Sequence, residues 1–197
     1  MRTTTPRLFI SAAMIYPILR YGHPVLRRKG APILHITPEI HQLAKDMLET
    51  MRGAHGVGLA AQQIGQALQI CVIDVTGVKE RESRMWIGGK PVKPEDHMPL
   101  VLLNPEISGT KSKEIGPEGC LSFPGLSADV ARSTRVKCKA KLLDGKVFEF
   151  EAGGLLGRAV QHEYDHLHGK LFTDLLSAQE RRERRQEIED LRTDYPE

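Results

Sequence analysis

The sequence predicts an α+β protein in which mostly antiparallel strands pack around a central helix. Three observations predict this class. Apolar residues recur at helical spacing in only two long stretches, one early in the chain and one late. Between them, runs of β-branched residues follow one another without helical periodicity, which favours antiparallel pairing over alternating α/β units. The last two runs flank Asp144-Gly145, a dipeptide that commonly closes a β-hairpin.

The first part of the chain predicts an extended arm and then a helix. Residues 17–30 (PILRYGHPVLRRKG) are rich in proline and glycine, so we expect them to wrap the surface. Thr37 suits the N-cap and Pro38 the first helical position. Apolar residues then recur at helical spacing at Ile40, Leu43, Met47, Leu48 and Met51. An amphipathic helix is therefore predicted over residues 38–53, with Gly53 ending it.

The middle of the chain predicts four strands and one long loop. Residues 55–65 (HGVGLAAQQIG) suit a tight connection from the helix to residues 68–75 (LQICVIDV), which suit a buried strand. Residues 77–99 are polar and contain several prolines and glycines, so we expect a long surface excursion. The other three strands are predicted at 101–107 (VLLNPEI), 135–143 (RVKCKAKLL) and 146–152 (KVFEFEA).

The last part of the chain predicts two helices of different character. Residues 155–172 (LLGRAVQHEYDHLHGKLF) form a helical pattern with one apolar face, which Gly169 ends. Residues 177–192 (SAQERRERRQEIEDLR) predict a highly charged helix whose glutamates and arginines can pair along one face.

Composition describes an ordinary globular chain of one domain. The chain has 197 residues, of which 40% are hydrophobic and 27% charged, so disordered and fibrous classes are excluded. A net charge of +3 is mild and its charges are interspersed, so no direct nucleic-acid readout is expected. Three widely spaced cysteines are a poor disulfide framework, which favours a reducing compartment and a cytoplasmic location.

The N-terminus has two interpretations. Arg2 and Arg7 precede a short apolar run from Leu8 to Leu19, which has the outline of a secretory signal but lacks an obvious small-residue cleavage site. We favour a loose extension over residues 1–13, with Met14 as an alternative initiator. No stretch approaches the roughly 18 apolar residues of a membrane span, so no membrane partner is expected.

The clearest chemical motif is HEYDH at residues 162–166. Positions i and i+4 of a helix share one face, so His162 and His166 can present two ring nitrogens to one metal ion. Glu163 lies beside the first histidine, where it can transfer protons to and from a water molecule without itself being a ligand. The alternative is a helix with two partly exposed histidines. Apolar neighbours such as Val160 and Leu167 indicate burial, and so favour a central metal-binding helix.

Two histidines leave the site one ligand short. Hydrolytic metal sites commonly have three protein ligands, and the third candidate is a carboxylate or a cysteine. Cys120 lies in a turn-rich stretch between Gly116-Pro117 and Pro124-Gly125, which can carry a thiolate to the helix, although a buried structural cysteine is the alternative. Cys71 and Cys138 lie within strand patterns and are better explained as buried structural residues.

A glycine-rich segment supplies a third element. GVGLAAQQ, residues 56–63, has glycines that allow close approach of the backbone to a ligand, and Gln62 or Gln63 can donate an amide hydrogen to an oxyanion. Its glycine spacing, and its position before a strand, exclude a dinucleotide-binding fingerprint.

Together, GVGLAAQQ, EGCLS (118–122) and QHEYDH (161–166) resemble the three signature segments of peptide deformylases, in the same order and at similar separations. That family removes the formyl group from the N-terminal formylmethionine of nascent chains, using Fe²⁺ that Zn²⁺, Ni²⁺ or Co²⁺ can replace. The resemblance implies a catalytic domain over residues 14–176, preceded by the extension and followed by a charged helix or tail over residues 177–197.

The resemblance also implies roles for individual residues. Cys120, His162 and His166 would be the metal ligands, with water as the fourth, and Glu163 would be the general base and acid. Gln63 and the backbone N–H of Leu121 would receive the oxyanion. A thiolate ligand suits ferrous iron but exposes it to oxidation, so we expect activity to fall in air unless the metal is exchanged.

Further implied residues surround the substrate. Arg132 would hold Asp165, and Glu118 would pair with structure around the pocket. The formylmethionyl peptide would add as a strand near Val57 and Gly119, with the methionine side chain in an apolar pocket. The substrate-binding residues expected on this basis are Val57, Gly58, Gly119, Glu118, Leu155 and Ala159, with His162 at the pocket wall.

Departures and rival interpretations remain. The chain has the 1–13 extension, a longer 77–99 segment than many bacterial members, and no basic residue in Gly125-Leu126-Ser127, which affects peptide preference but not the reaction. A zinc endopeptidase would need a third ligand after His166, where the choices are poor. A binding module with a structural metal is the other rival. The charged helix resembles those with which some bacterial members reach the ribosome, although we favour a solvated helix because its acidic residues offset its basic ones.

Overall fold

The computed structural model describes residues 13–193. Residues 1–12 of the predicted extension and residues 194–197 of the predicted tail lie outside this range. The strands are β1 (Gly58–Ala60), β2 (Ile70–Ile73), β3 (Ser83–Ile87), β4 (Lys90–Val92), β5 (Leu100–Gly109), β6 (Lys113–Cys120), β7 (Phe123–Ser133), β8 (Arg135–Lys141) and β9 (Val147–Gly153). The helices are α1 (Pro38–Gly53), α2 (Gly154–Leu167), α3 (Ala178–Glu183) and α4 (Arg185–Asp190), with short 3₁₀ helices at Pro24–Arg27, Ala61–Ile64, Pro94–His97 and Phe172–Leu175.

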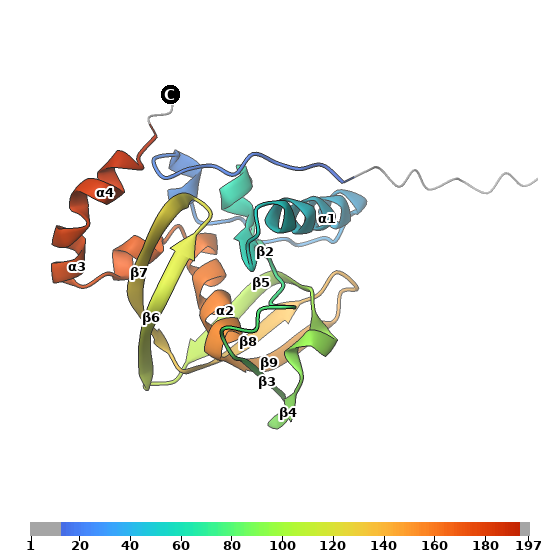
Figure 1. The fold of residues 1–197 in the computed structure, drawn as a ribbon. Helices are drawn as coiled ribbons and strands as arrows, with labels where there is room; N and C mark the ends of the chain where they lie inside the picture. The colour runs from blue at the N-terminus through green and yellow to red at the C-terminus, as the bar shows by residue number, and fades with distance from the viewer. Residues whose placement is uncertain (1–12, 194–197) are drawn as a thin grey trace, which may run out of the picture.

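The strands form one large sheet and one separate hairpin (Figure 1). The seven-stranded sheet has the order β1-β2-β5-β8-β9-β3-β4, and each neighbouring pair is antiparallel. β6 and β7 pair with each other, also antiparallel, and form the two-stranded sheet. The predicted α+β class with antiparallel strands is confirmed, as is the hairpin at Asp144-Gly145, which joins β8 to β9.

Helix α2 occupies the centre of the molecule, between the large sheet and the β6–β7 hairpin (Figure 1). Its apolar residues pack into a buried cluster with residues of β2, β5, β8 and β9, among them Leu156 and Val160. Because burial of apolar surface is the main favourable term in folding, this packing fixes the helix within the core. Arg158, His162 and His166 instead reach β6 and β7, where they contact Val130, Glu118 and Cys120.

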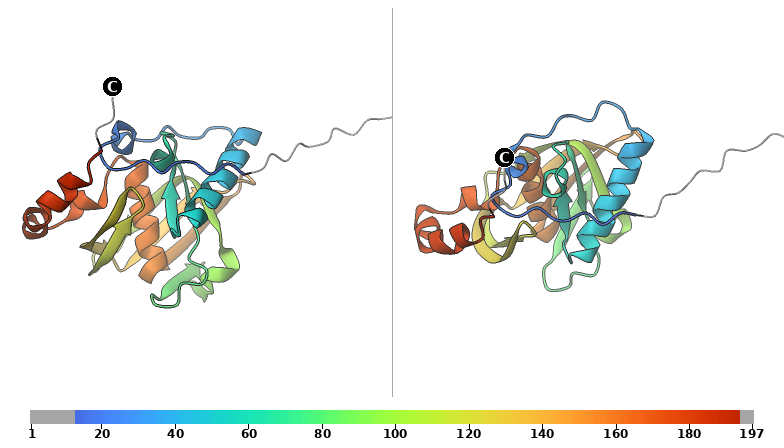
Figure 2. Two further views of the ribbon diagram at one scale, coloured as in Figure 1. Left: turned by 45° about the horizontal axis from the view of Figure 1, so that its top comes forward. Right: turned by 90° about the horizontal axis from the view of Figure 1, so that it is seen from above.

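Helix α1 covers the opposite face of the large sheet (Figure 2). Alternate residues of β2 point to the two sides: Ile70 and Val72 join the cluster with α1, while Cys71 and Ile73 join the cluster with α2. The prediction of a helix over residues 38–53 is confirmed at both ends. Thr37 is the N-cap residue, but its side chain makes no capping hydrogen bond.

The prediction of a surface excursion over residues 77–99 is wrong. This segment contains β3 and β4, and β3 pairs with β9 inside the large sheet. Met85 is buried against Ala152, and Trp86 lies under the guanidinium of Arg135. The polar composition hid the strand because only one of its two faces enters the core.

The prediction of a turn-rich stretch around Cys120 is also incomplete. Residues 113–133 form the long β6–β7 hairpin, although Gly116, Pro117 and Gly119 lower the strand propensity of β6. Pairing with β7 and packing on α2 override that propensity.

The charged tail is helical but divided, since α3 and α4 meet at Arg184. Its few apolar residues, Ile188 and Leu191, pack against the cluster formed by the hairpin and Phe172. Among residues 13–193, no helix is long and apolar enough to cross a membrane.

Candidate metal centre and active site

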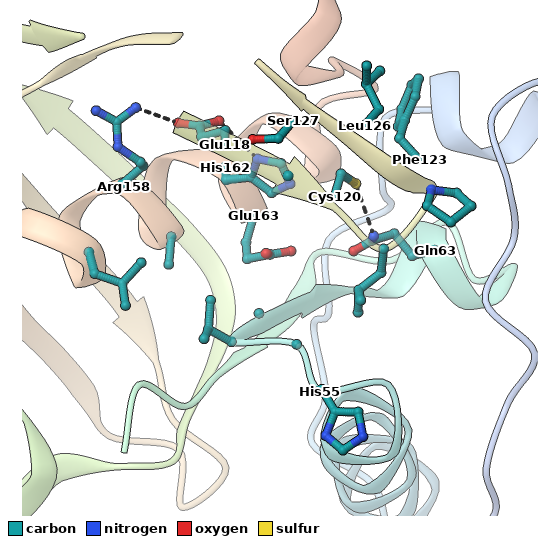
Figure 3. Close-up of a pocket in the computed structure, with 18 of the residues that line it drawn as sticks. His55, Gln63, Glu118, Cys120, Phe123, Leu126, Ser127, Arg158, His162 and Glu163 are labelled. Atoms are coloured by element: carbon teal, nitrogen blue, oxygen red, sulfur yellow. Dashed lines mark hydrogen bonds and ion pairs between the residues drawn. The ribbon is translucent and has the colours of Figure 1, made fainter. Parts of the chain in front are cut away.

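Three side chains with metal-binding atoms converge at the end of β6. His162 and His166 lie one turn apart on α2, and their Nε2 atoms are 3.2 Å apart. The Sγ atom of Cys120, the last residue of β6, is 3.3 Å from the Nε2 of His166. The candidate ligand atoms of these three residues all lie within 4.8 Å of one another. Figure 3 shows Cys120 and His162 directed into the same space.

The β6–β7 hairpin places Cys120 beside the helix. Cys120 pairs with Phe123 across a turn formed by Leu121 and Ser122. The ring of Phe123 is fully buried and contacts the rings of Tyr21 and Phe172. This aromatic anchor holds the turn, and therefore the sulfur atom, in a defined position.

A buried carboxylate orients the first histidine. Glu118 Oε2 lies 3.1 Å from His162 Nδ1. A carboxylate accepts a hydrogen bond there, so Nδ1 carries the ring hydrogen and the Nε2 lone pair is left for a ligand. Glu118 also accepts hydrogen bonds from Arg132, at 2.8 and 2.9 Å, and from Arg158, at 3.0 Å. Burial raises the pKa of Glu118, but its hydrogen bonds with His162 and Arg132 have a larger, opposite effect. The pKa is therefore lowered from its usual value to about 2.

Arg132 links this carboxylate to the metal helix. Its guanidinium binds Glu118 with two nitrogens and Asp165 of α2 with the third. Arg158, one turn before His162, binds Glu118 and also donates to the carbonyl oxygen of Val130 on β7 at 2.8 Å. The two arginines therefore join β6, β7 and α2 around the histidines.

The side chains of Cys120, His162 and His166 suit a divalent cation. Burial and the nearby His162 lower the pKa of His166 well below its usual value, which keeps its ring neutral, the form that binds metals. In His162, burial lowers the pKa, but hydrogen bonds with Cys120 and Glu118 raise it well above the usual value. One sulfur and two imidazole nitrogens form a donor set that suits borderline-soft divalent ions.

Glu163 lies beside this donor set in an enclosed position. Its side chain is 3% exposed, and its Oε2 atom has no hydrogen-bond partner among the described residues. A Cβ atom built on Gly58 would lie 2.2 Å from Glu163 Oε1, so the missing side chain at position 58 makes room for the carboxylate. Burial raises the pKa of Glu163 to about 7.

Gln63 approaches the sulfur from the opposite side of the cleft. Its Oε1 accepts a hydrogen bond from the N–H of Ala60 at 2.9 Å, which fixes the direction of the amide. Its Nε2 then donates to Ser122 Oγ at 3.2 Å and lies 3.5 Å from Cys120 Sγ. Gln62, the other glutamine of the segment, points away and donates to the carbonyl of Arg28.

Cys120, His162, Glu163 and Gln63 line a cleft of about 530 Å³. The expected substrate-binding residues all line it, from three directions: Val57 and Gly58, Glu118 and Gly119, and Leu155 and Ala159. Within the described chain, β1 is one of the two outer strands of the large sheet and β6 pairs only with β7, so two strands border the cleft without a partner on that side. The carbonyl of Val57 is already bound by the N–H of Asp74 at 2.9 Å.

Sequence reasoning missed several residues of the site. Arg158 and Ser122 contact Glu118 and Gln63, and Arg81 lines the cleft from the loop before β3. Arg158 precedes His162 by four residues, so helical spacing was a signal that could have found it. Arg81 carried no such signal. Cys71 and Cys138 are buried in strands, as expected, and burial raises the pKa of both thiols, that of Cys138 to about 12.

Known proteins that share this sequence pattern and fold belong to one family. Residues 15–182 match the family model described as polypeptide deformylase. A peptide deformylase of Methylacidiphilum infernorum is 54% identical over 179 residues, which cover 91% of this chain and 94% of the relative.

Solved structures give the same result. The crystal structure of a peptide deformylase from Legionella pneumophila is 37% identical, with a TM-score of 0.75 over 89% of this chain and 94% of the other. That of a peptide deformylase from Synechococcus elongatus, in complex with actinonin, is 35% identical, with a TM-score of 0.73 over 89% and 85%. Both likenesses span most of the chain.

Proposed function

The chain belongs to the polypeptide deformylase family. These hydrolases remove the formyl group from the N-terminal formylmethionine of nascent polypeptides, and we propose how the residues of this chain carry out that reaction. We propose that Cys120, His162 and His166 hold a divalent metal ion. The convergence of the Cys120 sulfur and the two Nε2 atoms, from a strand and a helix distant in sequence, is the observation that carries this proposal.

Ferrous iron is the proposed physiological ion, and Zn²⁺, Ni²⁺ or Co²⁺ would replace it. The support is the donor set, since a thiolate with two imidazoles accepts both iron and zinc. When bound, such an ion supplies Lewis-acid polarisation of the formyl oxygen and a water molecule of lowered pKa. Glu118 holds His162 in the tautomer that this role requires.

Glu163 is the proposed general base and acid. Its carboxylate would take a proton from the attacking water and return it to the amine nitrogen that leaves with the peptide. The support is its position beside His162, its exclusion from bulk water, and an Oε2 atom without a partner in the described chain. Gly58 keeps the space that the carboxylate needs.

Gln63 and the main-chain N–H of Leu121 are the proposed donors to the oxyanion of the tetrahedral intermediate. The Ala60 N–H holds the amide oxygen of Gln63, so its Nε2 faces the Cys120 side of the cleft. Leu121 directly follows Cys120 in the turn and lines the same cleft. Donors fixed in advance stabilise a developing charge without reorganisation.

The peptide is proposed to lie between β1 and β6 as an added strand. Edge strands bind extended chains through main-chain groups, which tolerates varied sequences. Val57, Gly58, Gly119 and Glu118 border this position. Leu155 and Ala159, 7% and 6% exposed, would contact the methionine side chain together with Val57 and His162.

The test is release of formate from a formyl-Met peptide by iron-loaded protein. We expect Glu163→Ala to keep the metal and lose turnover, and Cys120→Ala to lose both. Cys138→Ala is the matched control, because it also removes a thiol but lies in the core away from the donors, and it should retain metal and activity. Actinonin, which the Synechococcus elongatus relative binds, should compete with the peptide.

Two results would contradict the proposal. The first is cleavage of internal bonds in unformylated peptides, which would indicate a zinc endopeptidase. The second is a Glu163→Ala variant whose activity equals that of the wild type, which would indicate a structural metal.

We propose residues 14–176 as the catalytic domain, residues 1–13 as an extension, and a cytoplasmic location suited to nascent chains. For residues 177–197, contact with the ribosome is proposed through the exposed arginines of α3 and α4. Reversal of Arg182 and Arg185 to Glu should then weaken cosedimentation with ribosomes and leave peptide hydrolysis unchanged.

A further inference from the structure

The metal cleft does not end at the proposed methionine pocket. A second cavity of about 280 Å³ adjoins it, and the two share Arg81, Leu155 and Arg158 as lining residues. Figure 3 shows Arg158 and Cys120 on opposite sides of His162, so the junction lies at the end of the cleft away from Gln63 and Phe123. Leu155, which borders the proposed methionine pocket, is also at the junction. The second cavity is therefore the space next to the proposed methionine pocket on its Leu155 side.

Main-chain contacts hold Arg81 at this junction. The N–H of Leu155 donates to the carbonyl of Glu82 at 2.8 Å, and Ser83 forms a β-bridge with Gly154. Gly154 has a φ of +61°, and a Cβ atom there would lie 2.2 Å from the Glu82 oxygen. The close approach of these two segments fixes position 81 next to the first turn of α2.

Arg81 differs from the other arginines that line the second cavity. Arg132 and Arg158 bind Glu118, and Arg84 lies 3.7 Å from Glu82. Arg81 is partly buried and has no hydrogen bond or ion pair to any residue in the 13–193 range. Glu114 lines the same cavity but forms no ion pair within 4 Å there. Arg81, which lines both cavities, thus retains its guanidinium donors for a ligand.

We propose that Arg81 makes this enzyme competent on N-formyl peptides whose first residue is methionine sulfoxide, by donating a hydrogen bond to the sulfoxide oxygen. This inference rests on the proposed function and on the placement of the methionine side chain near Leu155. A closed apolar pocket would reject the sulfoxide, because its polar oxygen would lose hydrogen bonds to water. Here the second cavity supplies space, and a charged donor replaces the lost bonds.

The experiment compares three peptides that differ only in the first side chain: formyl-Met-Ala-Ser, its sulfoxide, and formyl-norleucyl-Ala-Ser. Norleucine has the length of methionine but no acceptor. The wild type, Arg81→Leu and Lys79→Leu are each loaded with nickel, and kcat/KM is measured by formate release. Lys79→Leu is the matched control, because it removes a cation from the same loop at a residue that lines neither cavity.

We expect the wild type to hydrolyse the sulfoxide peptide within about tenfold of the methionine peptide. Arg81→Leu should lower kcat/KM for the sulfoxide by about tenfold, the effect of one hydrogen bond to a charged donor, and change the other two by less than about twofold. Lys79→Leu should change none.

Equal losses on all three peptides, or an unchanged sulfoxide rate in Arg81→Leu, would overturn the role of Arg81 while the methionine peptide still supports deformylation. If the wild type released formate from none of the three peptides, the proposed function would be overturned, and this inference with it.

Discussion

The carboxylate of Glu163 occupies the space that a side chain at position 58 would fill. A Cβ atom on Gly58 would lie 2.2 Å from Oε1, 2.8 Å from Cδ and 3.0 Å from Cγ of Glu163. These three nearest atoms all belong to the side chain of Glu163, so a larger residue at position 58 would displace the carboxylate first. The glycine of β1 therefore positions a group on α2 that is distant in sequence.

Gly58→Ala tests this relationship. We expect the variant to fold and to keep its metal, but to lose about 10²-fold in kcat, because a small displacement of a proton-transfer group is costly. Formate release and metal content measure the two effects. Gly53→Ala is the control, since nothing lies within 4 Å of a Cβ atom there, and it should retain full activity. Normal turnover in Gly58→Ala would contradict the proposed role of the Glu163 carboxylate.

Loss of Arg132 should destabilise the whole molecule. Arg132 is 6% exposed and neutralises Glu118 and Asp165, so Arg132→Met leaves a buried carboxylate with less compensation. Breaking such a pair costs about 3–5 kcal/mol. Urea denaturation measures this loss. Arg184→Met, which breaks the surface pair with Glu187, should cost about 1 kcal/mol or less. Equal effects of the two substitutions would show that the buried network adds no more stability than the surface pair.

The Asp74 carboxylate should make stability depend on pH. Burial raises its pKa, but hydrogen bonds from Thr76 and Arg52 outweigh this and lower the pKa below the ordinary 3.8. A lowered folded-state pKa stabilises the protein above the unfolded value, and this stabilisation is lost as pH falls through the folded value.

The wild type should therefore be more stable than Asp74→Asn at neutral pH. We expect a difference of at most about 1 kcal/mol, because the Arg52 side chain is 47% exposed. The difference should hold from about pH 5 to pH 8 and shrink below about pH 4. Urea titrations at each pH measure it, and a difference that persists in full at pH 2 would contradict the assignment.

Removal of the metal should lower thermal stability. A ligand that binds only the folded state stabilises it by mass action, so treatment of loaded protein with a chelator should lower Tm, and Zn²⁺ or Ni²⁺ should restore it. Cys120→Ser should show a much smaller shift, because one donor of the three is weakened. Calorimetry of loaded and stripped samples makes the comparison. A Tm that does not respond to the chelator in the wild type would argue against a metal at these residues.

Elements set by local spacing were predictable from the sequence. The helix at residues 38–53 follows from its apolar period and Pro38, and the β8–β9 hairpin follows from Asp144-Gly145. β3 and the β6–β7 hairpin were not predictable in this way. Ser83–Ile87 is polar on one face, and Lys113–Cys120 carries glycine and proline, so both depend on partners far along the chain.

By itself the sequence determined that His162, Glu163 and His166 can share one metal site, because the turn of a helix sets their relative positions whatever surrounds it. Only the tertiary structure decided which residues meet them. Cys120, Glu118 and Arg81 arrive from separate strands and loops, and their distances to α2 depend on long-range packing that no local spacing encodes. For that reason the ligand pair was visible in the sequence, whereas Arg158 and Arg81 were found only in the fold.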